Sequence, residues 1–324
     1  MAATSVVSRA LSAMSNVQIS LIMSITANML NILLSVMLIP WIGFIGAPIT
    51  ATVCDIYECV GLIVLASRNP DFRKCWGGFS LHAFKQWGSY FKLACPAFVL
   101  MCIEWWTWDL QTFIAGYISM SAQAVQAVAP GVGDVQYCLG QAMGSAAATV
   151  VGNMLGEGDI RSAKRAAALT MMVTFGLMLV QLVIFIIFRT DLARLFTQEE
   201  NIFAGIVSLL PLALLFSFVD GHQAAMCGVI QGAGKQDVGA GIVFTCYWIV
   251  GVPLGIVLAF GFVGPAQGLK GQWIGMLLAV VGHFSLFAFA IWRLDWEGIA
   301  ADILRRTSEE RSRSVRLMEV TAAS

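Results

Sequence analysis

Charged residues are scarce in this sequence: only 12% of the 324 residues are Asp, Glu, Lys or Arg, whereas 58% are hydrophobic. A soluble globular domain carries about 25% charged residues. The chain therefore has too little polar surface to cover a water-exposed fold of its length. Because lipid then has to be its main solvent, the composition predicts an all-α integral membrane protein whose first partner is the bilayer.

Several patterns of soluble biochemistry are also missing. The net charge is +0 and no zinc-finger or helix-turn-helix spacing occurs, so we expect no nucleic-acid partner. The eight cysteines form no CxxC pair, which argues against a disulfide framework and a metal site. The stretch GAGK over residues 232–235 lacks the spacing of a phosphate loop, and no GxGxxG occurs. We therefore expect neither an enzyme nor a bound cofactor.

Apolar runs of bilayer-spanning length are abundant. We predict about eight transmembrane helices, at about 19–40, 45–67, 89–116, 122–154, 167–188, 202–227, 238–261 and 268–292. The fourth is overlong and is expected either to extend past the bilayer or to break at Pro130 and Gly131. With alternating spans, all Lys and Arg residues except Arg189, Arg194 and Lys270 lie on the side of the amino terminus. Because cytoplasmic loops are enriched in these residues, we expect both termini in the cytoplasm, at a plasma or vacuolar membrane.

Two acidic residues, Glu104 and Asp220, lie well inside predicted spans. A charge there costs about 2.5 kcal/mol or more, so such residues usually face a cavity and bind something. Asp109 is a third acidic candidate, about 140° around the helix from Glu104. Trp105 and Trp106 flank Glu104, and their ring faces could hold an organic cation by cation–π attraction or could simply pack.

Further polar residues accompany Asp220. Gln223 lies one turn beyond it on the same face and could orient a ligand or bond a neighbouring helix. Tyr247 and Trp248 form an aromatic pair in the next span, whereas His82 and His283 are interpreted as packing residues. In the second span, Asp55 and Glu58 share one face, which suits either a cation site or two acids facing water.

Small residues and prolines predict how the spans pack. The pairs Gly140 with Gly144, Gly152 with Gly156, and Gly251 with Gly255 have GxxxG spacing, which predicts close helix contacts. Proline at 96, 211 and 253 could bend its span or could be a structural kink only.

A weak internal repeat is visible. GFIG over residues 43–46 and GLKG over 268–271 each lead into an apolar run that contains small residues. Repeated helix bundles are typical of secondary transporters. If the first two spans correspond to the last two, four further helices are expected before residue 19.

Five local patterns, in this order and spacing, resemble the eukaryotic branch of the multidrug and toxic compound extrusion (MATE) family from about residue 15 to 295. They are CIEWWTWD at 102–109, VGNMLGEGD at 151–159, FVDGHQ at 218–223, GVIQGAGKQ at 228–236, and YW with GVPLG at 247–255. The chain departs from the family at Val150, where an arginine is often found, and at Asp55 and Glu58, where uncharged residues are expected.

The resemblance implies a fold of two six-helix lobes, of which this chain would lack the first four helices. Residues 1–75 would then be the last two helices of an incomplete amino-terminal lobe, 76–298 a complete carboxy-terminal lobe, and 299–324 a charged cytoplasmic tail. By resemblance, Glu104, Asp220 and Asp109 match acidic positions of the family.

The implied function is secondary antiport, in which small organic cations, drugs or metabolites are exported in exchange for protons or sodium ions. Two alternatives remain open. One is a truncated, non-transporting membrane protein or a subunit that self-associates or assembles with a chain supplying the missing lobe. The other is a lipid-linked sugar flippase of a related superfamily, which would need a basic cavity. We expect this chain alone not to perform concentrative antiport.

Overall fold

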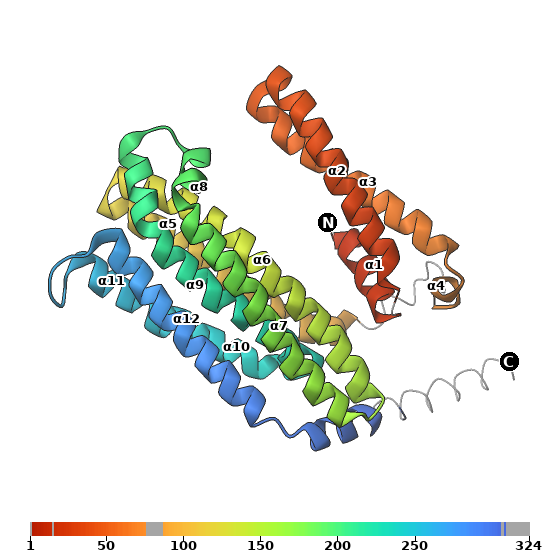
Figure 1. The fold of residues 1–324 in the computed structure, drawn as a ribbon. Helices are drawn as coiled ribbons and strands as arrows, with labels where there is room; N and C mark the ends of the chain where they lie inside the picture. The colour runs from red at the N-terminus through yellow and green to blue at the C-terminus, as the bar shows by residue number, and fades with distance from the viewer. Residues whose placement is uncertain (1, 15, 76–86, 306–307, 309–324) are drawn as a thin grey trace, which may run out of the picture. The chain divides into compact units, whose positions relative to one another are not determined.

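The computed structural model describes residues 2–14, 16–75, 87–305 and 308, and nearly all of them are helical (Figure 1). The all-α prediction is confirmed, since no strand occurs in this part of the chain. Two compact units are present, Met1–Phe91 and Lys92–Ser324. Within the described residues, five helical stretches are long and apolar enough to cross a membrane: Val17–Arg68, Ile160–Ile187, Glu200–Gly232, Gly241–Phe260 and Gly268–Trp292.

The first of these stretches contains two of the predicted spans, so it is a helical hairpin. Two further predicted spans, α5 (Trp87–Ile118) and α6 (Met120–Gly156), are long helices but are not among the five. Both carry polar side chains within their length, including buried Gln111, Gln126 and Gln136. Every predicted span therefore corresponds to a long helix, and these two are the more polar ones.

The first unit consists of α1 (Ala2–Ala13), α2 (Val17–Ile42), η1 (Gly43–Ile45), α3 (Gly46–Arg68) and α4 (Pro70–Cys75). Helices α2 and α3 lie antiparallel (Figure 1), and Gly43 makes the turn with a φ of 68°. The Ser24 hydroxyl of α2 donates a 2.7 Å hydrogen bond to Glu58 Oε1 of α3. Glu58, one of the two acids expected to form a cation site or face water, is thus bonded to the neighbouring helix.

The second unit holds the remaining long helices. After α5 and α6 follow α7 (Ile160–Ile187), α8 (Arg189–Phe196), α9 (Glu200–Gly232), α10 (Gln236–Phe244), the segment η3 (Thr245–Gly251), α11 (Val252–Phe260) and α12 (Gly268–Trp292). Helix α9 packs against α6, α7 and α12 (Figure 1). It is therefore the central helix of this unit.

Glycines bring α6 and α9 together at backbone distance. A Cβ on Gly140 would lie 2.1 Å from the carbonyl oxygen of Gly221, and one on Gly228 would lie 1.9 Å from that of Gly144. Because residue numbers rise together along the contact, the two helices are parallel. The close contact predicted for Gly140 and Gly144 is confirmed.

The other two glycine pairs differ from each other. Gly251 and Gly255 approach α12, where their Cβ atoms would lie 2.7 Å from Ala279 Cβ and 3.1 Å from the Gln272 carbonyl oxygen. In the remaining pair, a Cβ on Gly152 would lie 3.5 Å from the Gly232 carbonyl oxygen of α9, whereas Gly156 has nothing within 4 Å, so the predicted contact is confirmed at Gly152 and wrong at Gly156. The reason is position, because Gly156 is the last residue of α6.

Helix α6 does not break. Pro130 lies inside the continuous helix Met120–Gly156, and Gly131 is helical as well. A proline removes one backbone hydrogen bond, but in a packed helix its neighbours compensate for the freed carbonyl. Of the two expectations for this overlong span, the break at Pro130 and Gly131 is therefore wrong. Pro211 is likewise inside an unbroken α9.

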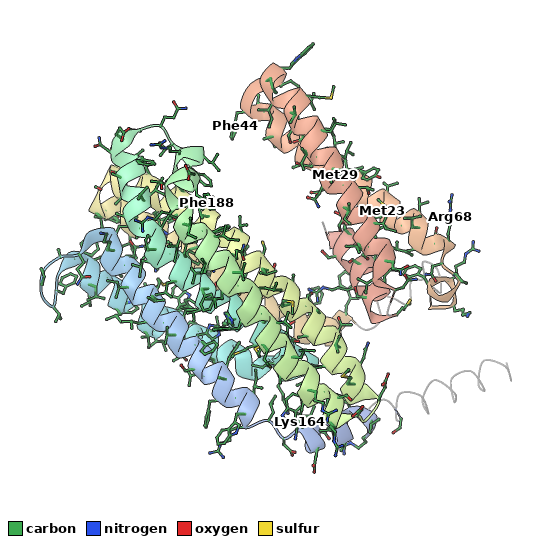
Figure 2. All side chains as sticks on the ribbon, viewed as in Figure 1. Met23, Met29, Phe44, Arg68, Lys164 and Phe188 are labelled. Carbon is green, nitrogen blue, oxygen red and sulfur yellow. The ribbon has the colours of Figure 1, made fainter. Side chains whose placement is uncertain are left out.

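A short capped turn joins α6 to α7. Asp159 caps α7, accepting a 3.0 Å hydrogen bond at Oδ1 from the backbone N–H of Ser162. The hydrogen bonds from Ser162 lower the pKa of the Asp159 carboxyl below its ordinary value, because they stabilise the charged form. Figure 2 shows Lys164 and Phe188 at opposite ends of this unit, near the two ends of α7.

The chain continues past α12 as a helical stretch over residues 296–305. Trp296, Ile299 and Ala300 are buried there in a cluster with residues near the carboxyl ends of α6 and α9 and the start of α7. The described part of the predicted tail, residues 299–305 and 308, thus begins with packed residues. Residues 306–307 and 309–324 lie outside the described part.

Candidate functional site

Asp220 is the one acidic residue in the interior of α9, and apolar residues make up most of that helix. It is partly buried, and its Oδ1 accepts a 2.9 Å hydrogen bond from the Tyr247 hydroxyl. A hydrogen bond to a charged acceptor contributes about 1.5–3 kcal/mol. This hydrogen bond therefore offsets much of the free-energy cost of placing a carboxylate inside the membrane. The structure brings these two predicted site residues together.

Tyr247 lies on a π-helical segment, η3 (Thr245–Gly251), between α10 and α11. A π-helical turn contains one more residue than an α-helical turn and is found frequently at functional sites. Cys246 and Tyr247 are both buried there, at 5% and 8% exposed. The sequence reasoning identified the tyrosine but not this segment, because no local residue pattern marks it.

His283 of α12 lies beside Tyr247. The two rings meet edge to face with centroids 5.5 Å apart, and the imidazole is only 1% exposed. Neither of its ring nitrogens has a hydrogen-bond partner among the described residues. Its burial against Tyr247 and Phe287 agrees with the packing role expected from its sequence context. Since buried polar atoms are nearly always partnered, the unpartnered nitrogens also make His283 a candidate site residue. His82 lies outside the described residues.

Two residues of α9 next to Asp220 are buried as well. Gln223 is 8% exposed and lies about one turn further along the helix. His222 is surrounded by aromatic rings, among them Phe175 and Phe218, and its Nδ1 lies 2.7 Å from the Phe218 carbonyl oxygen. Gln223 therefore has the burial that a ligand-orienting side chain needs, and that role stays a prediction.

Of the candidates on α5, Asp109, Trp105 and Trp106 are more exposed than Asp220. The side chain of Glu104 lies outside the described part, whereas Asp109 is exposed and Trp105 and Trp106 are 64% and 58% exposed. Trp108 is the tryptophan of this motif that packs into the core of the second unit. The roles predicted for Glu104, Asp109, Trp105 and Trp106 are not decided by this geometry.

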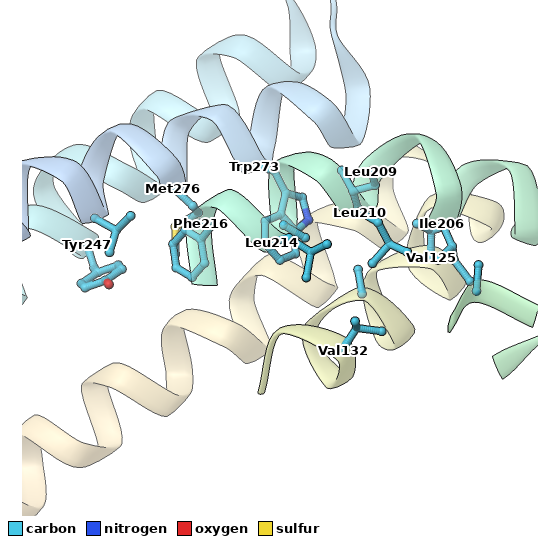
Figure 3. Packing of buried hydrophobic residues seen from close by; sticks show 14 residues of the cluster. Val125, Val132, Ile206, Leu209, Leu210, Leu214, Phe216, Tyr247, Trp273 and Met276 are labelled. Carbon is cyan, nitrogen blue, oxygen red and sulfur yellow. The ribbon is translucent and has the colours of Figure 1, made fainter. Parts of the chain in front are cut away.

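That core combines aliphatic and aromatic side chains and lies along α9 (Figure 3). The rings of Trp108 and Trp273 lie 5.5 and 5.7 Å from Phe216, each edge to face. Tyr247 and Met276 belong to the same cluster. The hydrogen bond to Asp220 therefore comes from a tyrosine whose ring is fixed in the packed core.

Buried amides link α12 to α5 and α6, and the sequence reasoning missed them. Gln272 donates to the side-chain and backbone oxygens of Gln111, the latter at 2.6 Å, and the Trp273 indole N–H donates to Gln126 Oε1 at 2.7 Å. Gln136 of α6 is fully buried, and neither of its amide atoms has a partner in the described ranges. These glutamines occur within apolar spans, and that feature of the sequence could have identified them.

Metal binding finds no support in the part of the chain that the structure describes. No group of three or more His, Cys, Asp or Glu side chains is placed there as a metal site would require. The candidate site is therefore a carboxylate with tyrosine, imidazole and amide neighbours, which can bind a proton or a cation.

Comparison with known proteins identifies relatives along most of the chain. The family model MatE matches residues 96–257. Multidrug and toxin extrusion protein 2 of Oryctolagus cuniculus is 30% identical over 256 residues, which cover 79% of this chain and 42% of that protein. Multidrug and toxin extrusion protein 1 of the same species is 27% identical over 274 residues, covering 84% and 48%. The chain thus spans about half the length of the curated relatives it matches.

Solved structures agree with the fold. The eukaryotic MATE transporter AtDTX14 superposes with a TM-score of 0.83 at 26% identity, covering 93% of this chain and 67% of that one. The Vibrio cholerae MATE transporter VcmN superposes with a TM-score of 0.75 at 18% identity, covering 91% and 67%. The family model spans half of the 324 residues and includes Asp220 and Tyr247, so this multi-pass membrane chain belongs to the MatE family, whose relatives include the multidrug and toxin extrusion proteins.

Proposed function

We propose that the complete protein is a secondary antiporter that exports small organic cations, drugs or metabolites in exchange for protons, with sodium ions as the alternative coupling ion. One observation carries this proposal: the Asp220 carboxylate lies within the central helix and accepts a hydrogen bond from Tyr247. A carboxylate can take up a proton or pair with a cation, and a nearby positive charge favours its charged form. Competition between the two is what exchange requires.

The distribution of basic residues favours cations over anionic substrates. The Lys and Arg residues of the described second unit lie at or near helix ends, for example Arg161, Lys164 and Arg165 in the first turns of α7 and Lys270 in the first turn of α12. Among the side chains that the structure describes, the buried polar ones are Gln, His, Ser and Thr, and Asp220 is partly buried. A lipid-linked sugar flippase would need basic side chains around its anionic substrate, so this alternative is less well supported.

The partner-subunit alternative follows from length, since the chain spans about half of its curated relatives. Alternating access needs two halves that move against each other. A self-associated form, or assembly with a chain that supplies further helices, would meet this need. The number of chains per transporting unit distinguishes this alternative from a single-chain antiporter.

The proposed orientation places the Lys164 end of the second unit (Figure 2) in the cytoplasm. Arg161, Lys164, Arg165, Lys235 and Arg293 lie in turns at that end, whereas Arg189, Arg194 and Lys270 lie near the other end. The excess of basic residues is typical of the cytoplasmic side. A plasma or vacuolar membrane suits an exporter driven by a proton gradient.

Exchange can be tested at the level of binding, without requiring a complete transport cycle. The purified chain is titrated with ethidium in weakly buffered detergent solution, and released protons are followed with a pH indicator. We expect binding to release protons, and Asp220→Asn to weaken binding by about tenfold or more while abolishing the release. Repeating the same titration with sodium as the metal cation of the buffer tests the sodium alternative.

Asp302→Asn is the matched control, because Asp302 is exposed on the helical stretch after α12 and pairs with Arg305 at 3.5 Å. It should bind ethidium as the unmodified chain does. Proton-driven ethidium uptake into proteoliposomes then tests transport by the complete protein. Binding that is indifferent to pH and unchanged in Asp220→Asn would contradict the proposal.

A further inference from the structure

The helix that carries Tyr247 is held to the rest of the unit on both sides of η3. At the carboxyl end, Gly251, the last residue of η3, and Gly255 of α11 lie against Ala279 and Gln272 of α12. On the amino side, a Cβ on Gly239 of α10 would lie 3.4 Å from the ring of Phe287, at the other end of α12. Ile242 and Val243 pack in the same buried cluster as Phe287. The contacts with α12 therefore fix how α10 and α11 are each rotated about the helix axis.

The two halves cannot be joined by an α-helix in their present rotation. An α-helix turns by about 100° per residue, and the π-helical segment accommodates one residue beyond that repeat. Without the extra residue, α10 with Tyr247 would rotate by about 100° relative to α11. Because α10 and α11 each contact α12, the extra residue has to be accommodated between them, at Thr245–Gly251.

This rotation decides which side chains face α9. In the π-helical form, Cys246 and Tyr247 are 5% and 8% exposed, whereas Ile249 and Val250 are 59% and 43% exposed. The Tyr247 hydroxyl lies 2.9 Å from Asp220. His283 packs edge-on against the tyrosine ring, with centroids 5.5 Å apart. The ring is held by its neighbours, so its direction depends on the helix rather than on a free side-chain rotamer.

We infer that the extra residue of η3 is the positioning element of the Asp220 site: it rotates Tyr247 onto the carboxylate, and loss of that residue would turn the hydroxyl away. The inference deepens the proposed function and rests on it for the role of Asp220. It adds that Tyr247 and the π-helical segment act as one unit, in which Gly251 permits the close contact with α12. Cation binding at Asp220 therefore depends on the length of a segment whose exposed residues do not touch the site.

Deletion of Ile249 is the direct test, with Ile249→Ala as its matched control. The deletion removes the extra residue, whereas the substitution alters the same exposed side chain and keeps the length. Reaction of Cys246 with methyl methanethiosulfonate, which converts the thiol to a methyl disulfide and releases methanesulfinate, is mapped by mass spectrometry and reports the rotation without depending on transport. We expect Cys246 to be protected in the unmodified chain and in Ile249→Ala, and to react in the deletion variant.

Ethidium affinity reports the link to Asp220. The deletion and Tyr247→Phe should each weaken binding by about 10- to 100-fold, the change expected for one hydrogen bond to a charged group. Combining them should cause no further loss, and neither should add to Asp220→Asn, since residues that act as one unit are not additive. Independent, additive losses would overturn the inference.

Hydrogen exchange keeps the inference testable if the deletion variant does not fold. Tyr247→Phe should accelerate exchange of the amides in residues 245–251, whereas Tyr117→Phe, at a tyrosine that is 85% exposed, should not. Unchanged exchange in Tyr247→Phe, or a folded deletion variant with protected Cys246, would overturn it. If Asp220→Asn leaves ethidium binding intact while Cys246 still becomes reactive in the deletion variant, the proposed function fails and the positioning role of η3 stands.

Discussion

Substituting Gly228 by alanine tests the contact that places α9, and with it Asp220. The new methyl group would lie 1.9 Å from the carbonyl oxygen of Gly144, and ordinary contact begins at 3.4 Å. The helices would have to separate by about 1.5 Å at this point, because the obstacle is backbone and no side-chain rotamer can relieve it.

The magnitude follows from the interface that this separation opens. A gap of about 0.5–1 Å already loses a quarter to a half of the dispersion energy of a contact. Overpacking in a well-packed core costs about 1–3 kcal/mol where neighbouring side chains can adjust. Here two backbones collide, so we expect a loss of about 3–5 kcal/mol in the free energy of unfolding. Asp220 lies two turns before Gly228, and ethidium binding should weaken as well.

Gly176→Ala is the matched control. Gly176 lies in α7, and a Cβ there would meet nothing within 4 Å. The same substitution should therefore be neutral or stabilise the helix by up to about 1 kcal/mol, because alanine has the higher helix propensity. The free energy of unfolding of both variants can be measured by titration with SDS in mixed micelles, followed by tryptophan fluorescence. Equal stability of the two variants within about 0.5 kcal/mol would refute the reasoning.

Three further changes have defined outcomes. Trp273→Phe leaves its glutamine acceptor without the indole donor and should cost about 1–3 kcal/mol in the same titration, whereas Trp292→Phe, at a side chain that is 75% exposed, should be nearly neutral. Asp159→Ala should lower the thermal midpoint at pH 7. Since the pKa of this carboxyl is lowered in the folded state, its stabilisation is present above the ordinary pKa and fades as the pH falls below it. The difference from the unmodified chain should therefore shrink on acidification, and a constant difference would argue against the cap. Cysteine at Lys164 should react with a membrane-impermeant maleimide from the cytoplasmic side and cysteine at Phe188 from the opposite side, and the reverse pattern would overturn the orientation.

The transmembrane helices followed from the sequence because each depends on a local property. Lipid cannot hydrogen-bond to the backbone, so an apolar run of sufficient length forms a helix whatever surrounds it. The same reasoning singled out Asp220, since a carboxylate inside such a run is costly unless it has a function or a partner. The glycine spacing at Gly140 and Gly144 predicted a close helix contact, although it did not identify α9 as the partner.

The tertiary structure decided what depends on neighbours distant in the sequence. Tyr247 reaches Asp220 across 27 residues because η3 has one residue more than the α-helical repeat, and that register is set by contacts of α10 and α11 with α12. Packing likewise kept α6 continuous through Pro130. Trp108 packs in the core while Trp105 and Trp106 are exposed, although all three belong to one motif. The residue pattern records which side chains are available within each helix, whereas the rotation of one helix against another is fixed only when their side chains pack together.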